Sequence, residues 1–206
     1  MSAWRSSCSQ SNLKARAALY ALVRAFFAER NVLEVETPIL SPSTATDPQL
    51  ESIQAQVKTH IGNESKPYFL QTSPEFAMKR LLANGYGSIF QIGKAFRREA
   101  FGRFHNPEFT LLEWYRIGFN QAQLMDEVGE LLIVVLNCDK PERLSYKSAF
   151  EQATDIDPLS TNISDLKRFL FERGKTDEWI TKETNVDILL QSIFSNFVEP
   201  SIGQTV

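Results

Sequence analysis

Cysteine and histidine are scarce in this chain of 206 residues, which contains two of each. Cys8 and Cys138 lie far apart, and neither belongs to a Cys-x-x-Cys pair, so the sequence indicates neither a disulfide framework nor a zinc site. His60 and His105 are too few to build a histidine-rich metal centre. We therefore predict no metal ligands among these residues.

Long apolar runs, positive charge and phosphate-binding loops are lacking as well. No stretch approaches the roughly 20 apolar residues of a membrane-spanning helix, and no cationic segment leads into an apolar core as in a signal peptide. These absences predict a cytoplasmic protein without membrane contact. The net charge of -3 argues against a nucleic-acid footprint. Neither a Gly-rich phosphate loop, nor His-Glu-x-x-His, nor Gly-x-Ser-x-Gly occurs in the sequence.

The length allows one domain with a substantial core. Residues 1–10 are rich in serine and are predicted to be disordered, and residues 11–206 are predicted to form that domain. An amphipathic helix is predicted from Ser11 or Asn12, as its cap, to Asn31, a residue that tolerates the left-handed conformation. A short alternating strand follows at 32–38.

A long β-hairpin is predicted in the middle of the chain, with strands at 89–99 and 109–115 around a loop that contains Gly102 and Pro107. The period of two places Glu113 and Tyr115 on one face of the second strand, and Leu112 and Trp114 on the other. Arg97 and Glu99 share a face of the first strand. Charged groups on a buried sheet face need partners, and a charged ligand could be one of them. The alternative interpretation is an Arg-Glu cross-strand pair on an exposed sheet, which needs no ligand.

A second informative segment is Ser73-Pro74-Glu75, which follows a short predicted strand. A serine cap, a proline at the first helical position and an acidic side chain near the N-terminal dipole are typical of a helix start. A helix start explains all three residues without any functional role. Further helices are predicted around 124–135, 145–153, 163–173 and 186–198, and the acidic pair Asp155 and Asp157 is predicted to form a turn beside Pro158 and not a metal site.

The central segment resembles motif 2 of the class II aminoacyl-tRNA synthetases, in their lysine-specific branch. The resemblance lies in Phe96-Arg97-Arg98-Glu99, then Arg103, then His105-Asn106-Pro107-Glu108-Phe109-Thr110 and Glu113-Trp114-Tyr115. It implies an α+β fold, with an antiparallel sheet flanked by helices. The first helix and the strand that ends at Pro38 resemble motif 1, which implies a homodimer through residues 12–38.

Within that branch the chain looks most like the elongation factor P lysine ligases, because its motif 1 helix begins within about a dozen residues of the start and leaves no room for an anticodon-binding barrel. The strings Thr72-Ser73-Pro74-Glu75 and Asp155-Ile156-Asp157-Pro158 also match. The resemblance implies that ATP and (R)-β-lysine, or lysine, form an aminoacyl-adenylate. The acyl group then passes to a lysine side chain of elongation factor P, and tRNA is not an expected partner.

The resemblance also implies roles for individual residues. Arg97 is the expected catalytic residue, which holds the α-phosphate. The expected ATP-binding residues are Arg97, Arg98, Glu99, Arg103 and Asn106. The expected substrate-binding residues are Ser73, Pro74, Glu75, Glu113 and Tyr115, with Glu75 on the α-amino group and Glu113 on an ammonium.

Two departures from the family pattern bear on activity. Arg98 and Ala100 stand where the family often has asparagine and glutamate, and no counterpart of motif 3 occurs before Val206. The chain is therefore expected to be an N-terminal portion carrying motifs 1 and 2, with the Mg²⁺ ligands in the part that follows. The alternatives are an inactive dimerisation or interaction fragment, or a fragment of a lysyl-tRNA synthetase that acts on tRNA.

Overall fold

The computed structural model describes residues 4, 8–58, 65–103 and 105–202. Most of the segment 1–10, predicted to be disordered, lies outside the described residues. The chain divides into two compact units, Met1–Leu136 and Asn137–Val206, and each is described by itself. The prediction of one catalytic domain over residues 11–206 stays a prediction.

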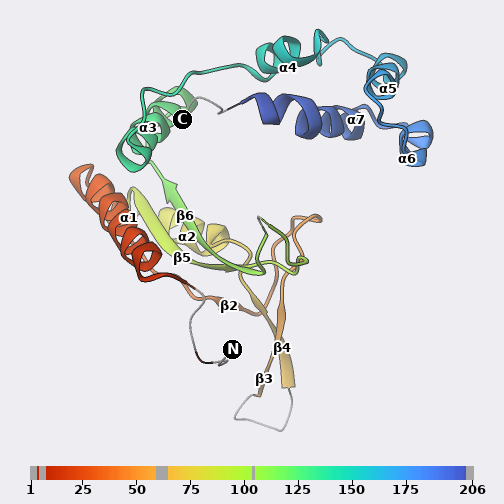
Figure 1. Cartoon of the computed structure of the whole chain (residues 1–206). Helices are drawn as coiled ribbons and strands as arrows, with labels where there is room; N and C mark the ends of the chain where they lie inside the picture. The colour runs from red at the N-terminus through yellow and green to blue at the C-terminus, as the bar shows by residue number, and fades with distance from the viewer. Residues whose placement is uncertain (1–3, 5–7, 59–64, 104, 203–206) are drawn as a thin grey trace. The chain divides into compact units, whose positions relative to one another are not determined.

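The described residues of the first unit form two three-stranded sheets and three helices (Figure 1). One sheet has the order β1-β5-β6, with β1 parallel to β5 and β6 antiparallel to it; the other has the order β2-β4-β3 and is antiparallel throughout. Helices combined with largely antiparallel sheets confirm the predicted α+β class. The elements are α1 (Gln10–Glu29), β1 (Leu33–Glu34), β2 (Leu40–Ser41), β3 (Gln54–Lys58), β4 (Ser65–Leu70), α2 (Glu75–Ala83), β5 (Ile89–Phe96), β6 (Glu108–Tyr115) and α3 (Gln121–Leu136).

The two ends of α1 differ in how well they agree with the boundaries predicted from the sequence. The predicted cap at Ser11 or Asn12 is wrong: the hydroxyl of Ser9 accepts a hydrogen bond from the backbone N–H of Asn12, so the helix starts earlier. At the other end Asn31 has φ 54°, the left-handed conformation that was predicted there. The strand predicted at 32–38 is reduced to the two residues of β1.

The core of the first unit lies between the β5–β6 hairpin and the helices α1 and α3. Phe27 is fully buried, and its ring stacks on Phe90 at 4.6 Å and lies 5.5 Å from Trp114, centroid to centroid. Leu131 of α3 joins this cluster, and Leu112 packs against it. One face of the hairpin is therefore occupied by helices, which leaves Glu113 and Tyr115 on the other face, as the period of two predicted.

The first strand of the hairpin ends earlier than predicted, at Phe96 instead of Glu99. Arg97 still donates its backbone N–H to the carbonyl of Pro107 at 2.9 Å, so hairpin pairing continues for one residue. The N–H of Arg98 instead donates to the carbonyl of Glu51 at 2.8 Å. The placement of Glu99 on a strand with Arg97 is therefore wrong, because the chain leaves the ladder to pair with another loop.

The described part of the second unit is helical. Its core is a cluster of buried apolar side chains, of which those at most 1% exposed are Phe150, Leu166, Leu170, Ile180, Leu189, Ile193 and Val198. The helices predicted at 145–153 and 163–173 are confirmed as α4, which Ser145 caps, and α5, which is followed by Gly174 with φ 76°. The elements are α4 (Tyr146–Thr154), α5 (Ile163–Glu172), α6 (Glu178–Lys182), α7 (Val186–Ile193), a π-helical turn (Phe194–Val198) and a 3₁₀ turn (Glu199–Ser201).

Two further findings concern these elements. The helix α6 was not predicted, since five residues are too few to show a helical period. The single helix predicted over 186–198 is α7 followed by the π-helical turn. Among the helices that the structure describes, none has the length and apolar character that crossing a membrane requires.

Candidate functional site

The candidate site lies on the face of the β5–β6 hairpin that points away from α1. Directly opposed residues of an antiparallel pair point to the same side, and the register pairs Gln91 with Glu113 and Ala95 with Phe109. We call this surface the site face. It carries Ile89, Gln91, Gly93, Ala95 and Arg97 from the first strand and its end, and Phe109, Leu111, Glu113 and Tyr115 from the second.

Three of the predicted substrate-binding side chains meet at one end of the site face. The hydroxyl of Ser73 donates to Oε2 of Glu113 at 2.7 Å, and the hydroxyl of Tyr115 donates to Oε1 of the same carboxylate at 2.8 Å. The Ser73 hydroxyl also accepts the backbone N–H of Glu75 at 3.1 Å. The segment between β4 and α2 is thereby fixed against β6, and a carboxylate is held in a defined orientation.

This end of the site is electrostatically negative. The pKa of the Tyr115 phenol is raised well above its ordinary value, first by burial and then by the hydrogen bond and the charge of Glu113, with a further contribution from the charge of Glu75. The phenol therefore remains a donor to Glu113 throughout the neutral range. Two carboxylates within electrostatic reach of one phenol form a setting that suits ammonium groups.

The remaining two substrate-binding predictions, Glu75 and Pro74, have more local roles in the structure. Glu75 Oε1 forms an i,i+4 ion pair with Lys79 Nζ at 2.5 Å, and both side chains are about half exposed. Exposed pairs of this kind contribute little stability, so the carboxylate can exchange its partner. Pro74 is buried and is the N-cap of α2. The prediction of Ser73 as the cap and Pro74 as the first helical residue is therefore wrong by one position.

The predicted catalytic residue, Arg97, lies toward the other end of the site face. Its side chain is half-buried, and its guanidinium carbon lies 5.0 Å from the centroid of the Phe109 ring. The Nε atom is buried and has no hydrogen-bond partner among the described residues. A partly desolvated guanidinium with an unused donor is a strong site for an anionic oxygen.

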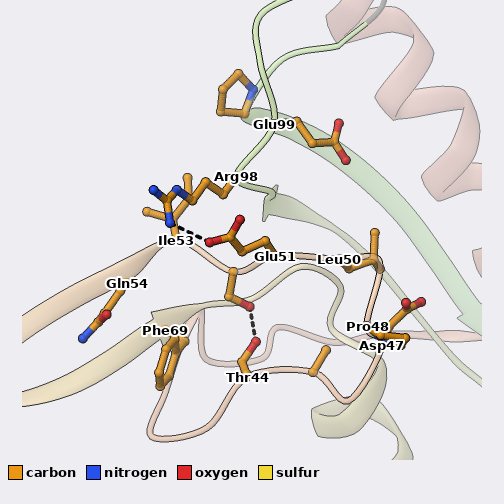
Figure 2. A pocket seen from close by; sticks show the side chains of 13 residues that line it. Thr44, Asp47, Pro48, Leu50, Glu51, Ile53, Gln54, Phe69, Arg98 and Glu99 are labelled. Atoms are coloured by element: carbon orange, nitrogen blue, oxygen red, sulfur yellow. Dashed lines mark hydrogen bonds and ion pairs between the residues drawn. The ribbon is translucent and has the colours of Figure 1, made fainter.

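The predicted ATP contacts Arg98 and Glu99 line a groove of about 830 Å³, formed with the loop at 44–54 (Figure 2). Arg98 Nη1 pairs with Glu51 Oε1 at 2.6 Å, and the two side chains are 71% and 64% exposed. Figure 2 shows this pair and the carboxylate of Glu99 directed away from it. An ion pair so exposed is readily exchanged for a ligand phosphate.

The other two predicted ATP contacts are not gathered at this groove. Asn106 lines a groove of about 920 Å³ on the opposite face of the hairpin, together with Arg16 of α1. Arg103 is exposed in the hairpin loop. The structure therefore brings Ser73, Glu113 and Tyr115 together, places Arg98 and Glu99 in one groove, and puts Asn106 elsewhere.

One residue of the site face escaped the sequence analysis. Gln91 is only 3% exposed, directly opposes Glu113, and its Oε1 has no hydrogen-bond partner among the described residues. The signal was present, because Gln91 is an even number of residues before Arg97 and therefore shares its face. A neutral amide in this strand did not stand out beside the charged residues of the hairpin.

Comparison with known proteins matches residues 1–187 to the family model described as tRNA synthetases class II (D, K and N). Relatives named elongation factor P--(R)-beta-lysine ligase include proteins of Vibrio cholerae serotype O1, 48% identical over 201 residues, and of Pseudoalteromonas translucida, 48% identical over 202 residues. A third, from Yersinia enterocolitica serotype O:8, is 47% identical over 201 residues.

These alignments cover 98% of this chain in each case. The chain spans 62% of the length of each of these relatives. The relatives carry the family name that the resemblance predicted, and the family model covers most of both units. The chain belongs to the class II tRNA synthetase family of the D, K and N group.

Proposed function

We propose that this chain acts in the ATP-dependent activation of (R)-β-lysine, or lysine, and in transfer of the acyl group to a lysine side chain of elongation factor P. The observation that carries the proposal is the Glu113 carboxylate, held by Ser73 and Tyr115 on the same face of the hairpin as Arg97. The names of the relatives supply the substrate and the acceptor.

The negative end of the site face would select the substrate. Glu113 would pair with one ammonium of the substrate, and Glu75 would leave Lys79 to pair with the other. An amino acid with a single amino group leaves a partly buried carboxylate without a partner, which is costly. Selection of a diamino acid follows from that penalty.

Arg97 would act at the other end. The substrate carboxylate attacks the α-phosphorus of ATP, an acyl-phosphate bond forms, and pyrophosphate departs with the electron pair of the broken bond. The Arg97 guanidinium would balance the charge that develops on the non-bridging oxygens. The amine of the acceptor lysine then displaces AMP from the adenylate, which gives an amide.

As proposed nucleotide contacts we keep the residues that the family resemblance implied, namely Arg98, Glu99, Arg103 and Asn106. Arg98 would exchange Glu51 for phosphate, and Asn106 would have to approach from the far side of the hairpin loop. Mg²⁺ normally accompanies ATP in such reactions. Within the ranges that the structure describes, no three His, Cys, Asp or Glu side chains are grouped to hold a metal, so we assign no ligand to it.

A homodimer through residues 12–38 is part of the proposal, as is a cytoplasmic setting. Exposed apolar side chains in that segment support it, since Leu13, Leu22 and Leu33 are 53%, 44% and 51% exposed. Sedimentation equilibrium tests it: Leu22→Glu is expected to shift the protein from dimer to monomer. A monomeric wild-type chain would contradict this part. We leave tRNA out as acceptor because the net charge is -3.

The direct experiment is intact-mass analysis of elongation factor P after incubation with this chain, ATP and (R)-β-lysine. The expected result is a gain of one β-lysyl group that requires ATP. Parallel reactions contain α-lysine in place of (R)-β-lysine, or tRNA in place of elongation factor P. If the folded chain supports neither a mass gain nor lysine-dependent pyrophosphate exchange, the proposal is wrong. A non-catalytic interaction role is then favoured.

A further inference from the structure

Gln91 is a buried polar side chain with an unused acceptor. It lies on β5 directly opposite Glu113, and only 3% of its surface is exposed. Its Oε1 has no hydrogen-bond partner within the described part of the chain. A buried carbonyl oxygen without a partner is unfavourable, and such atoms in native proteins call for an explanation.

The neighbouring glycine keeps the amide in this position. A Cβ atom added at Gly93 would lie 2.9 Å from Nε2 of Gln91, closer than real Cβ atoms approach another heavy atom. Gly93 is two residues further along the same strand face, in the direction of Arg97. The absence of a side chain at this position therefore leaves room for the Gln91 amide beside Glu113.

The hydrogen-bond capacity of the cluster indicates what is missing. Ser73 and Tyr115 each donate to one oxygen of Glu113, which leaves further lone pairs on that carboxylate. No lysine or arginine in the described ranges forms an ion pair with Glu113. What remains unused is a set of acceptors, on Glu113 and Gln91, from residues paired across two strands. An ammonium has three donors and no acceptor, and is therefore complementary to this set.

We infer that Oε1 of Gln91 accepts a hydrogen bond from the side-chain ammonium of the amino-acid substrate, the same ammonium that Glu113 pairs. Gln91 is then a specificity residue. This inference rests on the proposed function and deepens it, because it names a neutral second acceptor for the substrate's cation. A substrate with a methyl group in place of that ammonium leaves both acceptors unpaired.

The test is calorimetric titration of the whole chain with lysine, (R)-β-lysine and norleucine, which lacks the side-chain ammonium. The variant Gln91→Met keeps the length of the side chain and removes the acceptor. Its affinity for lysine and for (R)-β-lysine is expected to fall about 10- to 100-fold, as for loss of a hydrogen bond to a charged group. Its affinity for norleucine is expected to stay the same or rise.

Gly93→Ala provides an independent variant, since it displaces the amide without removing it. It is expected to weaken lysine binding as well, and the double variant is expected to bind no more weakly than Gln91→Met alone, because both changes remove the same contact. Gln121→Met, an exposed glutamine at the start of α3, is the matched control and is expected to bind as the wild type does. Circular dichroism and the thermal midpoint check folding of each variant.

The outcomes are distinguishable. If the wild type does not bind either diamino acid, the proposed function fails and this inference fails with it. If the wild type prefers lysine to norleucine and the folded Gln91→Met variant keeps that preference, the inference alone is overturned. Should Gln91→Met fail to fold, unchanged lysine affinity in Gly93→Ala overturns it.

Discussion

The hydroxyl of Tyr115 donates a 2.8 Å hydrogen bond to Oε1 of Glu113, and the two side chains lie two residues apart on one face of β6. Burial and this carboxylate raise the pKa of the phenol above its ordinary value of 10.0. The folded protein therefore holds the phenolic proton more tightly than the unfolded chain does. The stability from this linkage is fully present below pH 10 and is lost as the pH rises through the folded-state pKa.

The first prediction concerns the loss of stability at alkaline pH that the raised pKa of Tyr115 implies. The free energy of unfolding of the wild type should decline as the pH is raised above 10, and Tyr115→Phe should decline less steeply because it has no phenol at this site. Urea unfolding on either side of pH 10 measures the slope. Tyr86→Phe, which removes a phenol that is 56% exposed, is the control and should decline as the wild type does. Equal slopes in all three proteins would contradict the prediction.

The second prediction concerns Arg97, whose buried Nε has no partner in the described residues. If this guanidinium holds the α-phosphate, Arg97→Ala should slow lysine-dependent ATP-pyrophosphate exchange by at least about 100-fold, the cost of losing one preorganised donor. Arg168→Ala removes an arginine from an exposed i,i+3 ion pair with Asp165 on α5. That control should retain the wild-type rate. Exchange at the wild-type rate in Arg97→Ala would remove the assignment.

In the β5–β6 hairpin, the sequence predicted which residues share a face but not where the first strand ends. Alternation alone put Trp114 and Glu113 on opposite faces, because a strand allows no other arrangement. The end of β5 could not be read in this way. It depends on the backbone of Arg98 pairing with Glu51, 47 residues earlier, and local patterns carry no information about such a contact.

The candidate site also depends on contacts between distant residues, which the sequence alone does not reveal. Glu113 and Ser73 were both singled out, but only the fold brings them to 2.7 Å across 40 residues of sequence. Asn106 was assigned to the nucleotide by resemblance, whereas the structure places it in the groove beside α1. Gln91 was overlooked, because an unused acceptor can be recognised only when the burial of its surroundings is known.

The third prediction tests the packing that fixes the site face. Phe27 is fully buried against Phe90 and Trp114, so Phe27→Ala should destabilise the protein by about 3–5 kcal/mol. Denaturant unfolding followed by hydrogen exchange of the β5 and β6 amides measures the loss in this unit. Val134→Ala, on α3 and 45% exposed, should cost less than about 0.5 kcal/mol. Similar losses in the two variants would contradict the proposed core.

The fourth prediction concerns the turn after α4, where Lys147 Nζ lies 2.5 Å from Oδ2 of Asp157. The hydrogen bond to Lys147, with a second one from the backbone N–H of Leu159, lowers the pKa of Asp157 below its ordinary 3.8. The stability from this linkage is therefore present above pH 3.8 and is lost as the pH falls through the folded-state pKa. Removing the ammonium removes the main cause of the shift.

Lys147→Met should therefore weaken hydrogen-exchange protection of α4 and α5 near neutral pH, and its protection should change less on acidification than that of the wild type. Lys182→Met is the control, because it removes a lysine from an exposed i,i+4 pair on α6 of the same unit. Exposed pairs of this kind contribute little, so the control should keep the wild-type response to acid. If Lys147→Met and Lys182→Met respond alike, Asp157 is not held by Lys147 in solution, and the turn is maintained by its backbone hydrogen bonds alone.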